Sequence, residues 1–267
     1  MSTVIFGNGN LGRAIAAGLA EHGEGPPLVL GRPAAGRHRS SDLGSPGLAF
    51  EASQSDAVVE NLGTAVAAGC RRFVVATTGW AESEDAVDRL LRSHGAAAVV
   101  APNFSIGVAL FLRLIDAATE LFGRHEGFDP YIVEWHRRDK LDRPSGTALE
   151  IARRLLAAHP GKARLAGTAA PPAPDELEVV AIRAGASPGL HLVGFDAPGE
   201  SVELRLTARD RSAYVAGALA AADWLRHAQR APGIHPFGPV VDDLIGRPTR
   251  PSQPLREVAG APSRWTT

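Results

Sequence analysis

The sequence predicts an α/β protein whose N-terminal part is a doubly wound parallel sheet and whose C-terminal part is an α+β unit with a mixed or antiparallel sheet. Two observations predict the first part. Short apolar strands alternate with helical segments, and a glycine-rich turn joins the first strand to the first helix. The second part is predicted because three strands over residues 177–206 follow one another with only turns between them.

The elements of the first part are predicted from short apolar runs and amphipathic stretches. A strand at 3–6 leads through the glycine turn into an alanine-rich helix that ends near residue 21. Because strands and helices alternate after it, we expect a parallel sheet. Further strands are expected at 28–30, 72–76 and 97–100, helices at 56–68 and 82–93, and a polar loop over 31–46.

The second part begins with a long apolar helix at 108–123, and the chain ends in a stretch rich in Pro and Arg. That last stretch, residues 247–267, is expected to be a flexible tail. Between them we expect strands at 131–135, 177–182, 189–195 and 202–206, helices at 147–159 and 213–228, and a Pro- and Ala-rich loop at 169–174.

Composition excludes several classes of protein. The 267 residues contain 28 Lys+Arg against 29 Asp+Glu, and this near-neutral charge gives no overall field that would attract nucleic acid or an anionic membrane. A single cysteine, Cys70, allows neither an internal disulfide nor a thiolate metal cluster. No apolar run approaches the ~18 residues of a membrane span, and no secretion signal is evident. We therefore expect a soluble cytoplasmic protein.

The turn Gly7-x-Gly9-x-x-Gly12 matches the dinucleotide fingerprint of a Rossmann-type fold, and it stands between an apolar strand and a helix. Glycines there let backbone N–H groups approach a pyrophosphate at the helix N-terminus, so Asn10 and Leu11 join the predicted cofactor site. The alternative is a purely structural strand–helix turn.

The end of the second strand indicates which dinucleotide binds. An acidic residue there would bind a ribose 2′-hydroxyl and favour NAD, whereas this chain has Gly31 and Arg32, with Arg37 and Arg39 nearby. A guanidinium suits a 2′-phosphate, so we predict NADPH as cofactor, with NADH as the other possibility. The alternative is that these arginines form a solvated loop surface.

The stretch from Glu134 to Ala148 carries the predicted chemistry. A strand ends at about residue 135, a polar loop follows, and the sequence Pro-Ser-Gly-Thr begins a helix. This start places Ser145, Gly146 and Thr147 around one anion-sized spot, to which Lys140 adds a positive charge; Lys140 is one of only two lysines in the chain. The alternative is an ordinary helix cap with a surface lysine.

His136, four residues before Lys140, is suited to supply a proton near neutral pH to a substrate that receives a hydride. His191 lies on a predicted strand, where a core or interface role is the commoner one. No group of His, Asp and Glu shows metal-ligand spacing, so we predict no metal.

The stretch His136-x-x-x-Lys140-x-Asp142-x-Pro144-Ser145-Gly146-Thr147-Ala148, preceded by Glu134, resembles the signature of dihydrodipicolinate reductases of bacterial lysine biosynthesis. The resemblance covers residues 1 to about 245. Further segments agree in order: Thr77-Thr78-Gly79, Pro102 to Val108, Ile182-Arg183-Ala184-Gly185, Gly189-x-His191, Gly199-Glu200 and Arg211.

The resemblance implies a homotetramer that uses NADPH or NADH to reduce 4-hydroxy-tetrahydrodipicolinate to tetrahydrodipicolinate with loss of water. It implies a dinucleotide-binding domain over residues 1–106 with 213–246 and a substrate-binding and tetramerisation domain over 107–212. His136 would be the proton donor, Lys140 its charged partner, and Gly146 and Thr147 the holders of a substrate carboxylate. The implied nicotinamide side is Ala76, Thr77, Thr78, Ala101, Pro102, Asn103 and Phe104, and Arg211 joins the cofactor residues.

Three departures from the family pattern bear on these expectations. Arg137 replaces the second His of the family; as a substrate contact, an arginine can still bind a carboxylate bidentately. The glycine turn is one residue shorter than the family's, and the Asp-Phe-Thr that usually follows the third strand is not evident near residues 50–53. Two alternatives remain open: an NADPH-dependent reductase of another cyclic imine or unsaturated acid, and an NADPH-binding homologue without catalysis.

Overall fold

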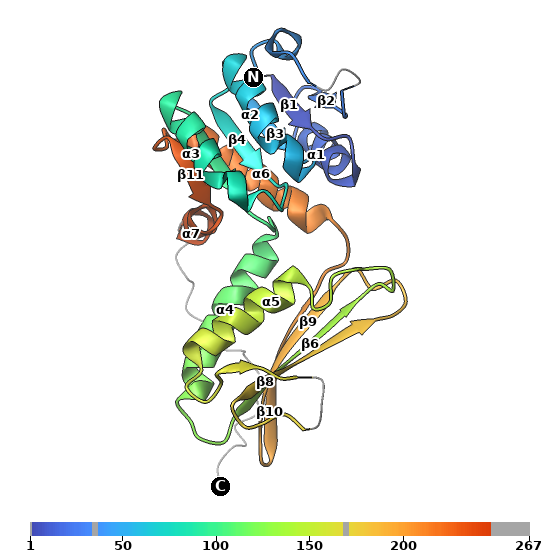
Figure 1. Ribbon diagram of the computed structural model, residues 1–267, viewed down its shortest axis with the longest axis vertical. Coiled ribbons are helices and arrows are strands. Elements are labelled where there is room, and N and C mark those ends of the chain that lie inside the picture. Colours follow the sequence, from blue (N-terminus) through green and yellow to red (C-terminus); the bar gives the residue numbers. More distant parts are fainter. Residues whose placement is uncertain (1, 34–36, 168–170, 247–267) are drawn as a thin grey trace, which may run out of the picture.

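The computed structural model describes residues 2–33, 37–167 and 171–246, and within these ranges it contains two sheets. The six-stranded sheet has the order β11-β5-β4-β3-β1-β2 with every pairing parallel, and the five-stranded sheet has the order β10-β9-β6-β8-β7. Figure 1 shows the two sheets in separate halves of the molecule. The predicted tail, 247–267, lies outside the described residues.

Alternation within the strands explains why the first sheet is covered on both faces. Ile5 faces the helices α1 and α6, while its neighbours Val4 and Phe6 face α2 and α3, as expected when successive side chains point to opposite faces. The elements of this half are β1 (Thr3–Phe6), α1 (Asn10–Glu21), β2 (Leu28–Leu30), β3 (Leu48–Glu51), α2 (Val58–Ala67), β4 (Arg72–Val75), α3 (Glu84–Ser93), β5 (Ala97–Val100), α6 (Ser212–His227), β11 (Gly233–Pro236) and α7 (Gly238–Gly246).

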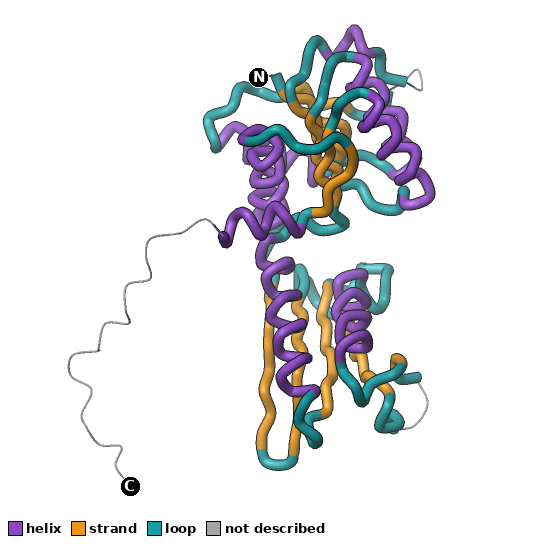
Figure 2. Tube along the Cα trace, turned by 90° about the vertical axis from the view of Figure 1, so that its left-hand side faces the viewer, coloured by secondary structure: helices purple, strands orange, loops and turns teal. Residues whose placement is uncertain are grey.

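The second sheet is mixed: its central strand β6 is antiparallel to β9 and parallel to β8. Helices α4 and α5 pack on one face of this sheet through Phe111, Ile115 and Ile151, and Figure 2 shows both helices beside the strands. The elements of this half are α4 (Ile106–Gly123), β6 (Asp129–His136), α5 (Gly146–Ala158), β7 (Arg164–Leu165), β8 (Glu176–Arg183), β9 (Leu190–Ala197) and β10 (Glu200–Thr207).

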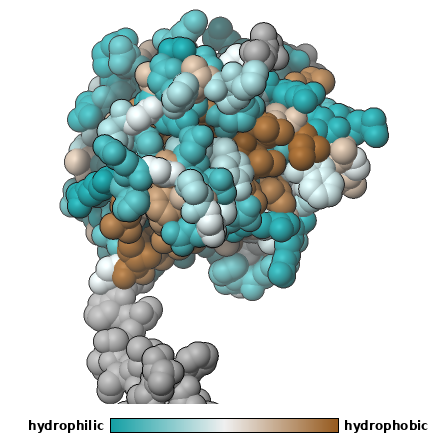
Figure 3. Space-filling model, turned by 90° about the horizontal axis from the view of Figure 1, so that it is seen from below, coloured by the Kyte–Doolittle hydropathy of each residue, from teal (hydrophilic) through white to brown (hydrophobic). Residues whose placement is uncertain are grey.

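The other face of the second sheet exposes apolar side chains. Trp135 pairs with Ile182 across the β6–β8 pairing, and Val133 pairs with Val180; Trp135, Ile182 and Val180 are each 40–42% exposed. Hydrophobic areas also interrupt the polar surface when the molecule is seen from below (Figure 3). Within the described ranges, no helix has the length and hydropathy needed to cross a bilayer.

Three strands and one α-helix of the described residues were not predicted: β3, β7, β11 and α7. β3 is only four residues long and fully buried, so it carries no alternation that would distinguish it from a loop. β11 is preceded by Pro232 and ends at Pro236, and proline in a sequence argues against a strand. The strand joins the sheet at its edge, beside β5, where a terminal proline is tolerated. Such short strands can be identified from their pairing in the sheet but not from the local sequence pattern.

Candidate functional site

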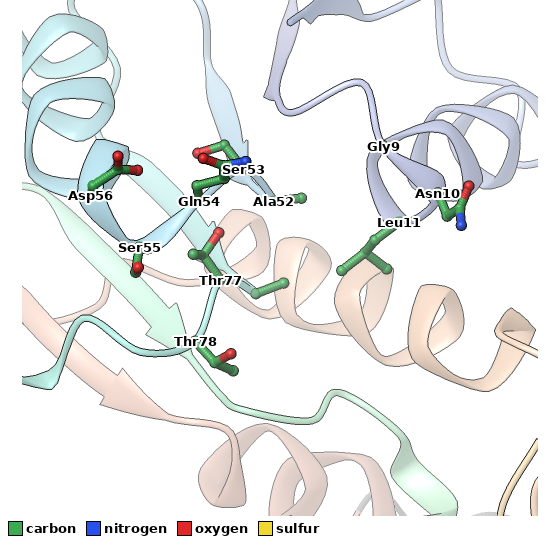
Figure 4. A pocket seen from close by; sticks show the side chains of 11 residues that line it. Gly9, Asn10, Leu11, Ala52, Ser53, Gln54, Ser55, Asp56, Thr77 and Thr78 are labelled. Atoms are coloured by element: carbon green, nitrogen blue, oxygen red, sulfur yellow. The ribbon is translucent and has the colours of Figure 1, made fainter. Parts of the chain in front are cut away.

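A cleft of about 660 Å³ opens at the carboxyl edge of the parallel sheet, where β1, β3 and β4 end. This edge is where ligands bind in doubly wound folds. Figure 4 shows the start of α1 on one side of the cleft and the ends of β3 and β4 on the other. The lining residues are Gly9, Asn10, Leu11, Ala52, Ser53, Gln54, Ser55, Asp56, Ala76, Thr77 and Thr78.

Two glycines of the turn are required by the backbone, and the third leaves space in the cleft. Gly7 has φ +109°, a conformation that L side chains rarely adopt, and a Cβ on Gly12 would overlap the carbonyl of Gly7. Gly9, in contrast, has open space around it and lies in the cleft. Because α1 begins at Asn10 without a side-chain cap, its first N–H groups are available to an anion in the cleft.

Glu51, a fully buried residue that the sequence analysis does not single out, directly precedes the lining segment that begins at Ala52. Its carboxylate accepts hydrogen bonds from the Ser53 backbone N–H at 2.8 Å, from Asn61 Nδ2 at 2.8 Å and from Thr77 Oγ1 at 3.1 Å. Burial raises the pKa of Glu51, against these hydrogen bonds. Glu51 thereby joins the lining segments after β3 and β4. The signal was an acidic residue at the end of an apolar run, at the place where the family's Asp-Phe-Thr was sought.

The remaining predicted cofactor residues are not among those that line this cleft. A Cβ on Gly31 would approach the Asn8 side chain, and Arg32 forms an exposed ion pair with Asp56 at 3.6 Å. Arg211 is the exposed N-cap residue of α6. Residues 101–104 follow β5 at the same edge of the sheet, with Ala101 and Phe104 buried.

The second part of the predicted site begins at the end of β6. Glu134 and His136 are two residues apart on one strand and so point to the same face of the sheet, and His191 on β9 stands directly opposite Glu134. All three side chains are buried. The distance from Glu134 Oε2 to His136 Nδ1 is 3.2 Å, and the rings of His136 and His191 meet edge-to-face with centroids 5.2 Å apart.

The other carboxylate oxygen of Glu134 contacts two further segments of the site. Glu134 Oε1 accepts from the backbone N–H of Ser145 at 2.9 Å and from Arg183 Nη2 at 2.8 Å. Arg183 also donates from Nε to the carbonyl of Lys140 at 3.3 Å and from Nη2 to the carbonyl of Asp142. Although burial opposes it, hydrogen bonds from Ser145 and Arg183 hold the pKa of Glu134 below its usual range.

Burial also lowers the pKa of the two histidines. It lowers the pKa of His136, which the carboxylate of Glu134 raises and the positive charge of Lys140 lowers. Burial lowers the pKa of His191 to about 4, with the neighbouring His136 as a second cause. His191 is therefore neutral at pH 7 and contributes shape and a ring edge rather than charge.

The predicted anion spot lies at the start of α5. Ser145 is buried and its Oγ accepts from the Ala148 backbone N–H at 3.2 Å, so this hydroxyl serves as the N-cap. Gly146 is exposed and Thr147 is half-buried. Lys140 Nζ lies 2.6 Å from Asp142 Oδ1, and this contact lowers the pKa of Asp142. Arg137 is half-exposed and paired with Asp139 at 2.9 Å.

Glu134, His136 and His191 place ligand atoms within 4.8 Å of one another, a grouping that the sequence spacing did not reveal. Two observations make it a poor cation site. Arg183 already pairs with Glu134, and Lys140 adds a further positive charge beside the histidines. A neutral imidazole on His191 and a titratable one on His136, next to one carboxylate, are suited to holding a proton.

Strand direction relates the two parts of the site. β6 and β10 are each antiparallel to β9, so both run the same way. β10 leads through residues 208–211 into α6, which packs on the parallel sheet. His136, at the C-terminal end of β6, therefore lies at the end of its sheet that faces the cleft-bearing half (Figure 1).

Comparison with known proteins points to one family. Residues 107–237 match the family model described as dihydrodipicolinate reductase, C-terminus. The 4-hydroxy-tetrahydrodipicolinate reductase of Methanopyrus kandleri is 34% identical over 234 residues, which cover 83% of each chain. That of Methanococcoides burtonii is 32% identical over 176 residues, 65% of this chain and 64% of the relative, so this alignment spans less than two thirds of the relative's length.

Solved structures share the fold. The dipicolinate-bound dihydrodipicolinate reductase from Paenisporosarcina sp. TG-14 is 18% identical, has a TM-score of 0.66, and aligns over 88% of this chain and 97% of its own. A probable dehydrogenase from Thermotoga maritima is 8% identical with a TM-score of 0.53, over 91% of this chain and 93% of its own. At these identities the likeness concerns the fold alone.

Proposed function

This chain belongs to the dihydrodipicolinate reductase family, and we propose that it reduces 4-hydroxy-tetrahydrodipicolinate to tetrahydrodipicolinate, with loss of water, in the diaminopimelate route to lysine. The observation that carries the proposal is the buried pair of Glu134 and His136, directly before a loop with Lys140 and the start of α5. Residues 1–106 with 213–246 bind the dinucleotide, and residues 107–212 bind the substrate and form subunit contacts.

The cleft beside the glycine turn fits a nicotinamide dinucleotide, because Gly9 leaves open space and the first N–H groups of α1 lack a side-chain cap. When bound, the dihydronicotinamide supplies a hydride. We assign the phosphates to the backbone of Gly7, Gly9, Asn10, Leu11 and Gly12, the 2′-phosphate of NADPH to Gly31 and Arg32, and the nicotinamide side to Ala76, Thr77, Thr78, Ala101, Pro102, Asn103 and Phe104, with Arg211 at the start of α6.

The substrate is a dicarboxylate, and two places suit its carboxylates. The N-terminal end of α5 at Gly146 and Thr147 attracts an anion through the helix dipole, with Lys140 close in sequence and Ser145 fixing the turn. Arg137 is half-exposed, so its guanidinium can leave Asp139 for a second carboxylate. His136 then donates a proton to the substrate atom at which negative charge develops.

The proposal is tested by following NADPH oxidation. The substrate is generated in the assay from pyruvate and aspartate semialdehyde by the aldolase that condenses them. We expect turnover with NADPH and slower turnover with NADH. Arg32→Ala should reduce kcat/KM for NADPH about tenfold, the value of one charge-assisted hydrogen bond, and leave NADH unaffected. Absence of turnover while NADPH binds would direct the search to other cyclic imines or unsaturated acids. Equal losses with both cofactors would reject the role of Arg32.

We further propose that the open face of the second sheet forms the subunit contacts of a homotetramer. The apolar pairs Trp135–Ile182 and Val133–Val180 on that face support this, because burying them would be favourable. Sedimentation should give four times the chain mass of 27.9 kDa. Val180→Glu should dissociate the assembly, whereas Val59→Glu, at an exposed valine on α2, should not. A wild-type monomer would reject the assignment.

A further inference from the structure

The environment of His136 distinguishes its two ring nitrogens. Nδ1 and Glu134 Oε2 lie 3.2 Å apart, and among the described residues neither of these buried atoms has a hydrogen-bond partner, so each is left with the other as its nearest ion-pair partner. Nε2 lies beside Gly189, where a Cβ would come within 3.1 Å of this nitrogen; Gly189 has φ +152°, which L side chains rarely adopt. One nitrogen is thus enclosed against a carboxylate, and the other has a backbone neighbour without a side chain.

We propose that Glu134 is a positioning residue that holds His136 with a proton on Nδ1, so that Nε2 is the atom that gives its proton to the substrate. The inference deepens the proposed function and rests on it for the identity of the substrate. During turnover the hydride brings two electrons to the substrate, and Nε2–H of the imidazolium supplies the proton. His136 is left neutral with Nδ1–H still directed at Glu134, and it regains its Nε2 proton from solvent.

Glu134 is itself fixed by contacts that do not involve His136. Its Oε1 is occupied by the Ser145 N–H and by Arg183, and the residue is fully buried. The carboxylate therefore cannot swing away, and Oε2 is left for the ring. Because Ser145 caps α5, the Glu134 side chain connects the proton donor His136 to the proposed carboxylate site at the start of that helix.

The charged and titratable groups around His136 are Glu134 on β6, Lys140 and Asp142 in the loop, Arg183 on β8 and His191 on β9. Glu134 raises the pKa of His136, whereas Lys140 and Arg183 lower it. Glu134→Gln should therefore lower that pKa, and Lys140→Gln should raise it. Since the donor must be protonated, the decline of kcat/KM with rising pH should move to lower pH in Glu134→Gln.

The first experiment is nitrogen-detected NMR of the full protein with isotope-labelled histidine, the His136 signal being assigned by its loss in His136→Gln. At high pH the wild type should show the Nδ1–H tautomer, and Glu134→Gln should shift it to Nε2–H. Glu24→Gln, which removes another carboxylate paired with an arginine, at 2.8 Å from Arg226, is the matched control and should change neither tautomer nor pKa. In turnover, Glu134→Gln should lose about 10–100-fold in kcat with little change in KM for NADPH.

An Nε2–H tautomer in the wild type overturns the proposal without any variant, so it stays testable even if Glu134→Gln does not fold. An unchanged His136 pKa in a folded Glu134→Gln overturns it as well. If the tautomer and pKa shift as expected but wild-type protein does not reduce the proposed substrate, the positioning role is supported and the proposed substrate is rejected.

Discussion

Replacing His136 with glutamine is expected to lower kcat by about 10²–10⁴-fold, the usual contribution of a general acid. Glutamine preserves most of the volume of the buried ring but has no proton to give at neutral pH. The dinucleotide cleft lies in the other half of the molecule, so NADPH binding should be unchanged. Steady-state turnover and NADPH fluorescence titration measure the two quantities separately.

His94→Gln is a suitable control, because His94 is an exposed residue at the end of α3 and should tolerate the change in both assays. Unfolding of His136→Gln must be compared with wild type, since the site is buried. A folded variant that keeps more than about a tenth of wild-type kcat would assign proton donation to another group, with Lys140 as the next candidate.

The local pattern was sufficient to predict the parts of the fold whose signals lie close together in the chain. The glycine turn, α1 and the alternation of strands and helices identify the parallel sheet, and Pro-Ser-Gly-Thr identified the start of α5. That Ser145 caps this helix was the alternative to its place in the predicted anion spot. Strand β11 was missed because its place beside β5 depends on the chain returning through α6 from the second sheet. No local pattern encodes that return.

The same distinction applies to the site. His136 and Lys140 were found because they stand four residues apart in one recognisable stretch. The role of Glu134 depends on Oε1 meeting Ser145 and Arg183, which are 11 and 49 residues away, and His191 enters through the register of β9 against β6. β6 runs to His136, one residue beyond the predicted strand, and so puts Glu134 and His136 on one face. Only the pairing of neighbouring strands shows what else faces them.

Replacing Gly217 with alanine is expected to destabilise the protein by about 3 kcal/mol, at the upper end of overpacking effects. Gly217 lies in α6, and a Cβ there would overlap the backbone carbonyl of Phe104, the last residue of the segment assigned to the nicotinamide side. A backbone atom cannot move aside as a flexible side chain can. Phe104 is also held by Phe237, with ring centroids 5.0 Å apart. Urea unfolding measures the loss, and weaker NADPH binding should accompany it.

Gly63→Ala supplies the control, since Gly63 also lies within a helix, α2, but a Cβ there meets nothing within 4 Å. That change should stabilise the protein by about 0.5–1 kcal/mol, because alanine favours the helix more than glycine does. The opposite signs of the two changes in unfolding free energy would distinguish the effect of close backbone contact from that of helix propensity. If Gly217→Ala were also stabilising, α6 would not press against the Phe104 backbone, and the returning helix would not be what fixes the segment after β5 beside the cleft.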